Sequence, residues 1–428
     1  MNNMVSRRAL LGALALGSGA SMLPRAALAW KAGGAALYPS THDFIAGFVA
    51  RRELAGTLAA IGKGQAAADF FGAGTQAMDS ARPVGPDTLW RLYSQTKPIT
   101  GVAAMLLVED GAMALDQPIA DFLPAFANMT VQNRPDGSIT DVRPAKGLIT
   151  VRHLLTHTSG LGYNIMLKGP LKKAYDAAGL VGGQVSRLPI PGVPSITPAP
   201  SLAAFADRLA ALPLVYEPGT QWNYSAGLDL LGRVIEVVSG QPFDAFLSAR
   251  LFDPLGMAST GFRVPASDVG RLATNYVRVG PLLLPIDPAT SSIYLDSPPM
   301  PYGGGGLVSS ARDYDCFLAM LLGEGETDGE RVMKPETARL AMSNLLPEGA
   351  RTAGTMVAGE GFGAGGRVSL AGSPIGEGVF GWGGAAGTIA FVDRVRGYRV
   401  GGYTQYMPPE TLPFQSDFGA AFYKDVLR

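Results

Sequence analysis

Residues 94–97 read Ser94-Gln95-Thr96-Lys97 and follow directly on a strand-like run, Thr88-Leu89-Trp90-Arg91-Leu92-Tyr93. Apolar residues then recur at helical spacing up to Leu107, and Asp110-Gly111 is a typical helix end. A serine and a lysine three residues apart on a helix share one face. A serine hydroxyl becomes a good nucleophile only when a base takes its proton, which a lysine can do where its surroundings disfavour the ammonium. The stretch thus predicts a nucleophile, Ser94, activated by Lys97. The alternative is an N-cap serine beside a solvated lysine.

A second motif follows about 130 residues later, at Pro218-Gly219-Thr220-Gln221-Trp222-Asn223-Tyr224-Ser225. A tyrosine between a turn and a helix can project its hydroxyl into a cleft. Near cations, that hydroxyl can serve as the base for Ser94 and return the proton to the leaving group. The alternative for Tyr224 is a core tyrosine whose hydroxyl is satisfied by packing partners.

A third motif, Gly381-Trp382-Gly383-Gly384-Ala385-Ala386-Gly387-Thr388, overlaps the start of a predicted strand. Glycines without a Cβ let a substrate lie against the strand edge, and a backbone N–H there can complete an oxyanion hole. Loss of one such donor typically costs about 3 kcal/mol of transition-state stabilisation.

The pattern along the rest of the chain predicts an α+β fold with a central antiparallel sheet flanked by helices. We expect a hairpin over residues 55–72, further strands at 305–309, 368–370, 387–392 and 398–405, and helices at 41–53, 151–156, 201–212, 226–239 and 414–427. Strands at both ends predict one discontinuous sheet domain, residues 30–92 with 300–428. Residues 93–299 would form a mainly helical domain, with the site in the seam between the two. Residues 168–200 are rich in Pro and Gly and are predicted to be a functional or mobile loop.

The three motifs, in this order and spacing, resemble the penicillin-recognising serine hydrolases, and most closely the family VIII carboxylesterases with the class C β-lactamase fold. The segments 92–100, 149–161 and 304–307 support the resemblance, which covers about residues 40–428. It implies that Ser94 is the nucleophile, that Lys97 is the proton acceptor or its electrostatic helper, and that Tyr224 is the general base or acid. It also implies an oxyanion hole formed by the backbone amides of Ser94 and Ala385. Whether Lys97 or Tyr224 takes the proton stays open.

Two departures from the family pattern bear on the substrate. Ala226 stands where the second motif often has asparagine, and Trp382 stands where the third motif often has lysine. Without that amide and that cation, the site suits a neutral ester, with Trp382, Gly383 and Gly384 lining it. Tyr163 and Tyr302, on glycine-rich loops, are either pocket walls or ordinary packing residues.

These motifs predict a carboxylesterase that hydrolyses short to medium acyl esters of small molecules through an acyl-enzyme. One alternative is a β-lactamase or D-amino-acid peptidase on the same fold, and another is a catalytically silent scaffold protein. The elbow G-x-S-x-G of the α/β-hydrolases is absent, and His153 and His157 are predicted to be structural. The single cysteine, Cys316, lies in an apolar run and is predicted to be buried and inert.

Composition excludes several other classes of function. Only three histidines are present, so we predict no metal, and no motif indicates a cofactor. The formal net charge is zero, so the chain lacks the excess of positive charge that is typical of nucleic-acid-binding proteins.

Residues 1–29 are predicted to be an export signal, and Arg7-Arg8, an apolar run and Ala27-Leu28-Ala29 resemble the twin-arginine type. As a helix, the apolar run would rise only about 22 Å, short of a hydrocarbon core of roughly 30 Å, so a membrane anchor is the weaker alternative. We therefore expect a periplasmic or secreted protein without stable membrane insertion.

Overall fold

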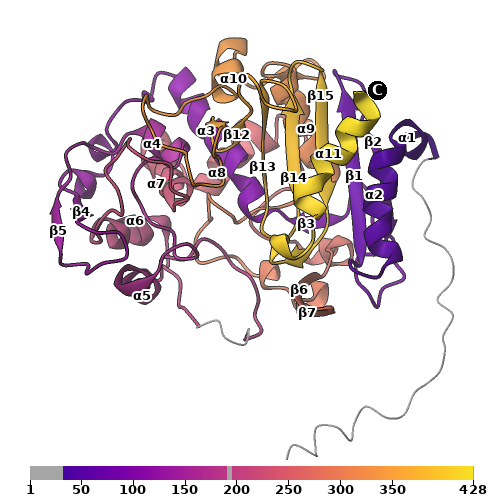
Figure 1. Ribbon diagram of the computed structural model, residues 1–428, viewed down its shortest axis with the longest axis horizontal. Coiled ribbons are helices and arrows are strands. Elements are labelled where there is room, and N and C mark those ends of the chain that lie inside the picture. Colours follow the sequence, from indigo (N-terminus) through magenta and orange to yellow (C-terminus); the bar gives the residue numbers. More distant parts are fainter. Residues whose placement is uncertain (1–31, 190–194, 428) are drawn as a thin grey trace, which may run out of the picture.

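The computed structural model describes residues 32–189 and 195–427. Its centre is a seven-stranded antiparallel sheet in the order β11–β12–β13–β14–β15–β1–β2 (Figure 1). The strands are β1 (Gly56–Lys63), β2 (Asp69–Gly74), β11 (Gly361–Phe362), β12 (Arg367–Val368), β13 (Val379–Gly383), β14 (Ile389–Asp393) and β15 (Tyr398–Tyr403). Ala60 in β1 lies opposite Gly401 in β15, so the first hairpin and the last strands of the chain form one sheet. The predicted α+β class with a central antiparallel sheet is confirmed.

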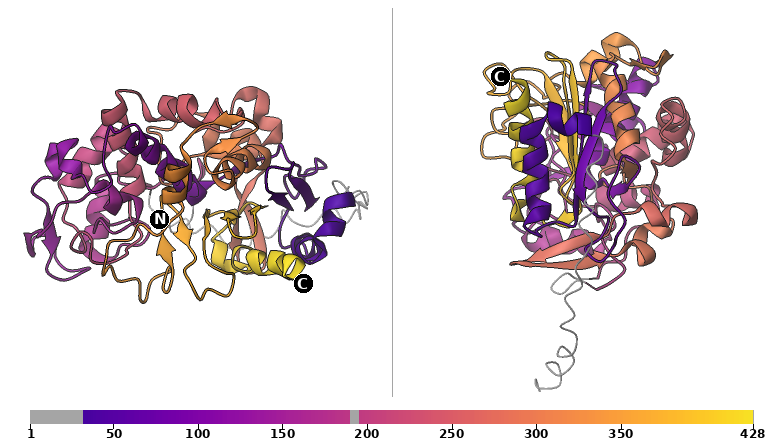
Figure 2. Two further views of the ribbon diagram at one scale, coloured as in Figure 1. Left: turned by 90° about the horizontal axis from the view of Figure 1, so that it is seen from above. Right: turned by 90° about the vertical axis from the view of Figure 1, so that its right-hand side faces the viewer.

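Helices cover both faces of this sheet. On one face, α2 (Pro39–Ala50) and α11 (Phe414–Val426) lie side by side, as the right-hand view of Figure 2 shows. In α11 the aromatic residues Phe414, Phe418 and Phe422 recur every fourth residue, and this stripe is buried together with Phe48 of α2. The opposite face is covered by α9 (Ala311–Leu322), which contacts β1, β14 and β15.

The helical part of the molecule is built around α3 (Lys97–Glu109), whose residues 97–107 are all buried. Helix α3 packs on α7 (Gly227–Ser239) and α10 (Pro335–Ala341), and α7 in turn contacts α4 (Val151–Leu155), α6 (Leu202–Ala210) and α8 (Phe243–Leu247). Other elements are α1 (Ala32–Leu37), α5 (Gly169–Ala177), the pair β4 (Thr130–Gln132) and β5 (Val142–Pro144), and the pair β9 (Glu326–Thr327) and β10 (Glu330–Arg331). Within the described residues, no helix has the length and apolar character needed to cross a bilayer.

Two sequence expectations differ from the structure. The stretch 168–200 is not all loop, because it contains α5, which buries Leu171 and Tyr175 at an amphipathic spacing. The strand expected at 305–309 appears as β8 (Val308–Ser310), and it pairs with β3 (Leu89–Arg91) instead of joining the seven-stranded sheet. Composition alone indicated neither helix α5 nor the pairing of β8 with β3, because the structure of each segment depends on partners far away in the sequence.

A second small sheet joins the two parts of the chain. Strands β6 (Asn275–Val279) and β7 (Leu282–Asp287), from the region expected to be helical, form a sheet with β16 (Tyr406–Met407) in the order β16–β6–β7. The domain boundaries near residues 93 and 300 stay a proposal.

Candidate active site

The segment that carries Ser94 makes a sharp turn between β3 and α3. Tyr93 adopts a positive φ of 45° although it is not glycine, and residues Tyr93–Thr96 form a 3-10 helix that runs into α3. Such a backbone conformation typically costs about 1–3 kcal/mol, so the surrounding structure must hold it. The Tyr93 ring packs edge-on against Tyr294, and its hydroxyl accepts a hydrogen bond from Asn275 Nδ2 at 3.2 Å.

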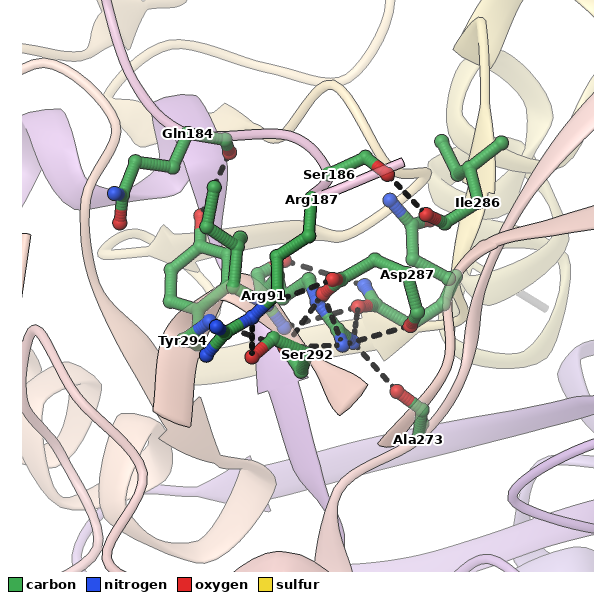
Figure 3. Close-up of polar contacts among 12 residues, drawn as sticks. Arg91, Gln184, Ser186, Arg187, Ala273, Ile286, Asp287, Ser292 and Tyr294 are labelled. Carbon is green, nitrogen blue, oxygen red and sulfur yellow. Dashed lines mark hydrogen bonds and ion pairs between the residues drawn. The ribbon is translucent and has the colours of Figure 1, made fainter. Parts of the chain in front are cut away.

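A buried arginine, Arg91, fixes the strand just before this turn (Figure 3). Its Nε donates to Asp287 Oδ2 at 2.7 Å, and its terminal nitrogens donate to the carbonyls of Ala273 and Asp287 and to the side chains of Ser292 and Gln405. Gln405 also accepts from the Arg91 backbone N–H at 3.0 Å. Both members of the ion pair are almost wholly buried, with 0% and 1% of their side chains exposed. Arg91 thereby ties β3 to β7 and to the chain after β15.

Replacing Arg91 with alanine is expected to lower the free energy of unfolding by about 3–5 kcal/mol, because it leaves the Asp287 carboxylate buried without its partner. Urea unfolding measures the loss. The control is Arg312→Ala, since Arg312 makes a similar two-bond pair with Asp87 at the surface, with 53% and 57% of the side chains exposed. That variant should lose less than about 1 kcal/mol. Equal losses in the two variants would show that Arg91 does not anchor the strand.

Three functional groups predicted from the sequence meet at Ser94. Its Oγ lies 3.1 Å from Lys97 Nζ and 2.7 Å from the Tyr224 hydroxyl, and both groups donate a hydrogen bond to it. Lys97 is completely buried, and its Nζ also donates to the Gly304 carbonyl at 2.5 Å. The same Nζ lies 4.7 Å from the centre of the Tyr224 ring. The structure therefore brings a hydroxyl, an amine and a phenol together, as general base catalysis at a serine requires.

Tyr224 is held in place by a buried histidine. His157 Nδ1 lies 2.9 Å from Ser225 Oγ, and the His157 ring is 4.8 Å from the Tyr224 ring. Burial, with Lys97 nearby, holds the pKa of His157 well below its ordinary value, so the imidazole is neutral. His153 instead belongs to a capping box with Thr150 at the start of α4. These contacts support the structural roles predicted for both histidines.

The third motif lies beside the other two. Trp382 Nε1 donates to the Tyr224 hydroxyl at 3.4 Å. A Cβ on Gly384 would lie 2.1 Å from the Leu92 carbonyl oxygen, so only glycine allows this turn to approach the segment before Ser94. Ala385, half-buried, follows directly. This close approach brings the Ala385 segment next to the turn that carries Ser94.

Helix α11 secures the same turn from outside the motif. Gln415 Nε2 donates to the carbonyls of Gly384 and Thr388 at 2.9 and 2.8 Å. A Cβ on Gly383 would lie 2.4 Å from that nitrogen, so Gly383 makes room for Gln415. Sequence reasoning missed Gln415, because nothing near it in the chain links it to the third motif.

The two candidate wall residues, Tyr163 and Tyr302, are both buried, with 3% and 1% exposed. The Tyr163 ring packs edge-on against Tyr224 at 5.3 Å, and Lys97 Nζ lies 5.4 Å from its centre. Their burial favours the packing alternative over an open pocket wall. Tyr163 therefore packs behind Tyr224 and Lys97, and a direct substrate contact from either tyrosine stays a proposal.

Two charged residues near the site were not singled out from the sequence. Asp229 is a fully buried acid in the apolar stretch Gly227-Leu228-Asp229-Leu230-Leu231, five residues after Tyr224, and this anomaly was visible in the sequence. Arg367 in β12 places its guanidinium carbon 5.3 Å from the centre of the Trp382 ring and pairs with Glu360 at 3.0 Å. The third motif lacks its own cation, but a cation from the neighbouring strand lies over its tryptophan.

The remaining nucleophile and metal candidates can be placed as well. Cys316 is partly buried, and burial together with neighbouring carboxylates raises its pKa to about 11, which keeps the thiol protonated and unreactive. In the parts of the chain that the structure describes, no three His, Cys, Asp or Glu side chains gather as a metal site would require.

Known proteins are similar to this chain in sequence or in fold. The family described as Beta-lactamase matches residues 41–421. Esterase EstB from Burkholderia gladioli is 35% identical in an alignment of 343 residues that covers 75% of this chain and 78% of EstB. Protein Rv1367c from Mycobacterium tuberculosis is 35% identical over 328 residues, 74% of this chain and 77% of that protein. The solved structure of EstCE1, described as a hydrolase with promiscuous acyltransferase activity, has a TM-score of 0.74 at 26% identity and covers 92% of this chain and 100% of its own.

Proposed function

The chain belongs to the beta-lactamase family, and from that premise we propose that it is a serine carboxylesterase acting on short to medium acyl esters. The observation that carries the proposal is the convergence of Lys97 Nζ and the Tyr224 hydroxyl on Ser94 Oγ, at 3.1 and 2.7 Å. Similarity to EstB, an esterase by name, favours ester cleavage.

In the proposed reaction, Ser94 Oγ attacks the ester carbonyl carbon while its proton passes to the neighbouring base. The carbonyl oxygen becomes an oxyanion, which the backbone amides of Ser94 and Ala385 would stabilise. The tetrahedral intermediate then collapses, the alcohol leaves with a proton, and the acyl group stays on Ser94. Water attacks this acyl-enzyme by the same steps and releases the carboxylic acid.

The identity of the proton acceptor has two candidates, Lys97 and Tyr224, because both contact Ser94 Oγ directly. Tyr224 also receives the Trp382 Nε1–H, which stabilises negative charge on the phenol oxygen. Either residue can return the proton to the departing alcohol, since both lie within hydrogen-bond reach of the reacting oxygen.

The rival within the same fold is a β-lactamase or D-amino-acid peptidase, which the sequence disfavours at Ala226 and Trp382. We expect hydrolysis of p-nitrophenyl butyrate to exceed hydrolysis of a chromogenic cephalosporin by about 30- to 150-fold in kcat/KM, because one missing charged contact changes binding by roughly 2–3 kcal/mol. Both assays are run on one preparation of the full chain. Efficient cephalosporin turnover without ester hydrolysis would reject the esterase proposal.

We also propose that the enzyme acts after export, on small-molecule esters in the periplasm or outside the cell. The proposed signal, residues 1–29, lies outside the described residues. Comparing the fractionation of the full chain with that of an Arg7→Lys, Arg8→Lys variant tests this proposal. A cytoplasmic location of the unaltered chain would contradict it.

A further inference from the structure

Asp229 is a buried acid beside the catalytic lysine that the proposed reaction does not use. It is the third residue of α7, and none of it is exposed. Its Oδ1 accepts the Gly304 N–H at 2.8 Å, whereas its Oδ2 has no hydrogen-bond partner among the residues that the structure describes. Burial raises the pKa of Asp229 to about 6, and the charge of Lys97 opposes this rise.

Gly304 links this acid to Lys97. Its N–H donates to Asp229, and its carbonyl accepts from Lys97 Nζ at 2.5 Å. A Cβ on Gly304 would lie 2.6 Å from Asp229 Oδ2, so the carboxyl group packs directly against this glycine. Since the other hydrogen bond of Lys97 Nζ goes to Ser94 Oγ at 3.1 Å, Asp229, Gly304, Lys97 and Ser94 form one continuous series of contacts.

The position of Asp229 in the first turn of a helix does not by itself explain its burial. Acids in the first turn of a helix are stabilised by the helix dipole, but the dipole does not explain why this carboxyl group is fully buried. Asp313 occupies the same third position in α9, and its carboxylate accepts from Ser310 Oγ, Ser259 N and Thr260 Oγ1, so both oxygens are used locally. Asp229 receives fewer such bonds, and the described cation that acts on it is Lys97.

The other titratable groups that face Asp229 are phenols. Tyr163, after α4, and Tyr302, before β8, both feel the Asp229 charge, and burial together with that charge raises the pKa of each. Both phenols therefore stay neutral at any pH at which the enzyme is assayed. The group of opposite charge that acts on Asp229 of α7 is Lys97 of α3.

We propose that Asp229 is a positioning residue that acts through Lys97: its carboxylate is the counter-charge of the Lys97 side chain and, by way of Gly304, holds that side chain against Ser94. An ammonium in that position stabilises the negative charge that develops on Ser94 Oγ as its proton leaves. The proposal rests on the proposed function only in that Lys97 activates Ser94, whatever the substrate.

Asp229→Asn tests the charge separately from the hydrogen bond, because the amide keeps the size and its oxygen can still accept from Gly304. We expect kcat for p-nitrophenyl butyrate to fall about tenfold with KM changed less than twofold, the effect of losing one nearby counter-charge. In the wild type, activity should fall as pH drops through about 6, because the carboxylate takes up a proton and loses its charge. This acid limb should be absent in Asp229→Asn. Asp313→Asn is the matched control, since it neutralises an acid at the same helix position and should keep the wild-type profile.

The rate at which a fluorophosphonate labels Ser94 is measured over the same pH range, because it reports on the nucleophile independently of the ester. Labelling with an acid limb but without ester hydrolysis would reject the esterase proposal and leave the role of Asp229 supported. An Asp229→Asn protein that keeps the wild-type limb in both measurements would overturn the role of Asp229. If that variant does not fold, the wild-type labelling profile decides, and a rate that is flat between pH 5 and 7 overturns the inference.

Discussion

Replacing Ser94 with alanine is expected to lower the hydrolysis rate of p-nitrophenyl butyrate by about 10⁶-fold, which is the usual effect of removing the nucleophile of a serine hydrolase. The Ser94 side chain contributes one oxygen, which receives hydrogen bonds from Lys97 and Tyr224. Alanine removes that oxygen and leaves the backbone of the 3-10 helix intact. Folding should therefore survive, with an unchanged circular dichroism spectrum and a Tm within a few degrees of the wild type.

A second serine substitution controls for the general effect of removing a hydroxyl. Ser201 caps α6 by accepting the Ala204 N–H at 3.1 Å, away from the three motifs. Ser201→Ala should lose about 1 kcal/mol of stability and retain its activity. Full activity in Ser94→Ala would mean that another residue is the nucleophile.

The next largest effects are expected at Lys97 and Tyr224, the two groups bonded to Ser94 Oγ. Tyr224→Phe removes only the hydroxyl that lies 2.7 Å from the nucleophile, and we expect kcat to fall by about 10²–10⁴-fold, the usual contribution of a general acid or base. Lys97→Met keeps most of the buried volume while removing the charge, so it should be impaired to a similar degree. Steady-state kinetics of both variants measures these losses.

The double variant separates joint from independent action. If the two residues act as one unit on the Ser94 proton, the second substitution should lower kcat by less than about tenfold more, because the mechanism has already failed. Losses that multiply to about 10⁶-fold or more would show that Lys97 and Tyr224 contribute independently, and this outcome would contradict the joint mechanism.

Much of this architecture could be predicted because its signals are local. The apolar spacing after Ser94 predicts α3, and the strand-like runs at both ends of the chain predict the hairpin and the later strands that form the sheet. The three motifs also predict which side chains meet, since each carries its own turn chemistry and lies next to a regular element. The structure brings Ser94, Lys97, Tyr224 and Trp382 together as that interpretation requires.

What could not be predicted depends on contacts between distant parts of the chain. In the sequence, Arg91 is an ordinary residue of a predicted strand. Its buried partners in β7 and at Gln405 become apparent only in the folded structure. Gln415 contacts the Gly384 turn only because α11 returns across the sheet. Helix α5 forms in a stretch whose proline and glycine content indicated a loop, since Leu171 and Tyr175 find a core to pack against. In each case tertiary packing, rather than local propensity, decides the outcome.

The central claim is that Ser94 is the single activated nucleophile of this enzyme. The most direct test is to treat the folded full-length protein with a fluorophosphonate, measure the intact mass, and locate the modified residue by peptide mapping. We predict one adduct per chain, on the peptide that contains Ser94, and none in Ser94→Ala. An adduct on a different serine, or no adduct on a protein that hydrolyses esters, would contradict the claim.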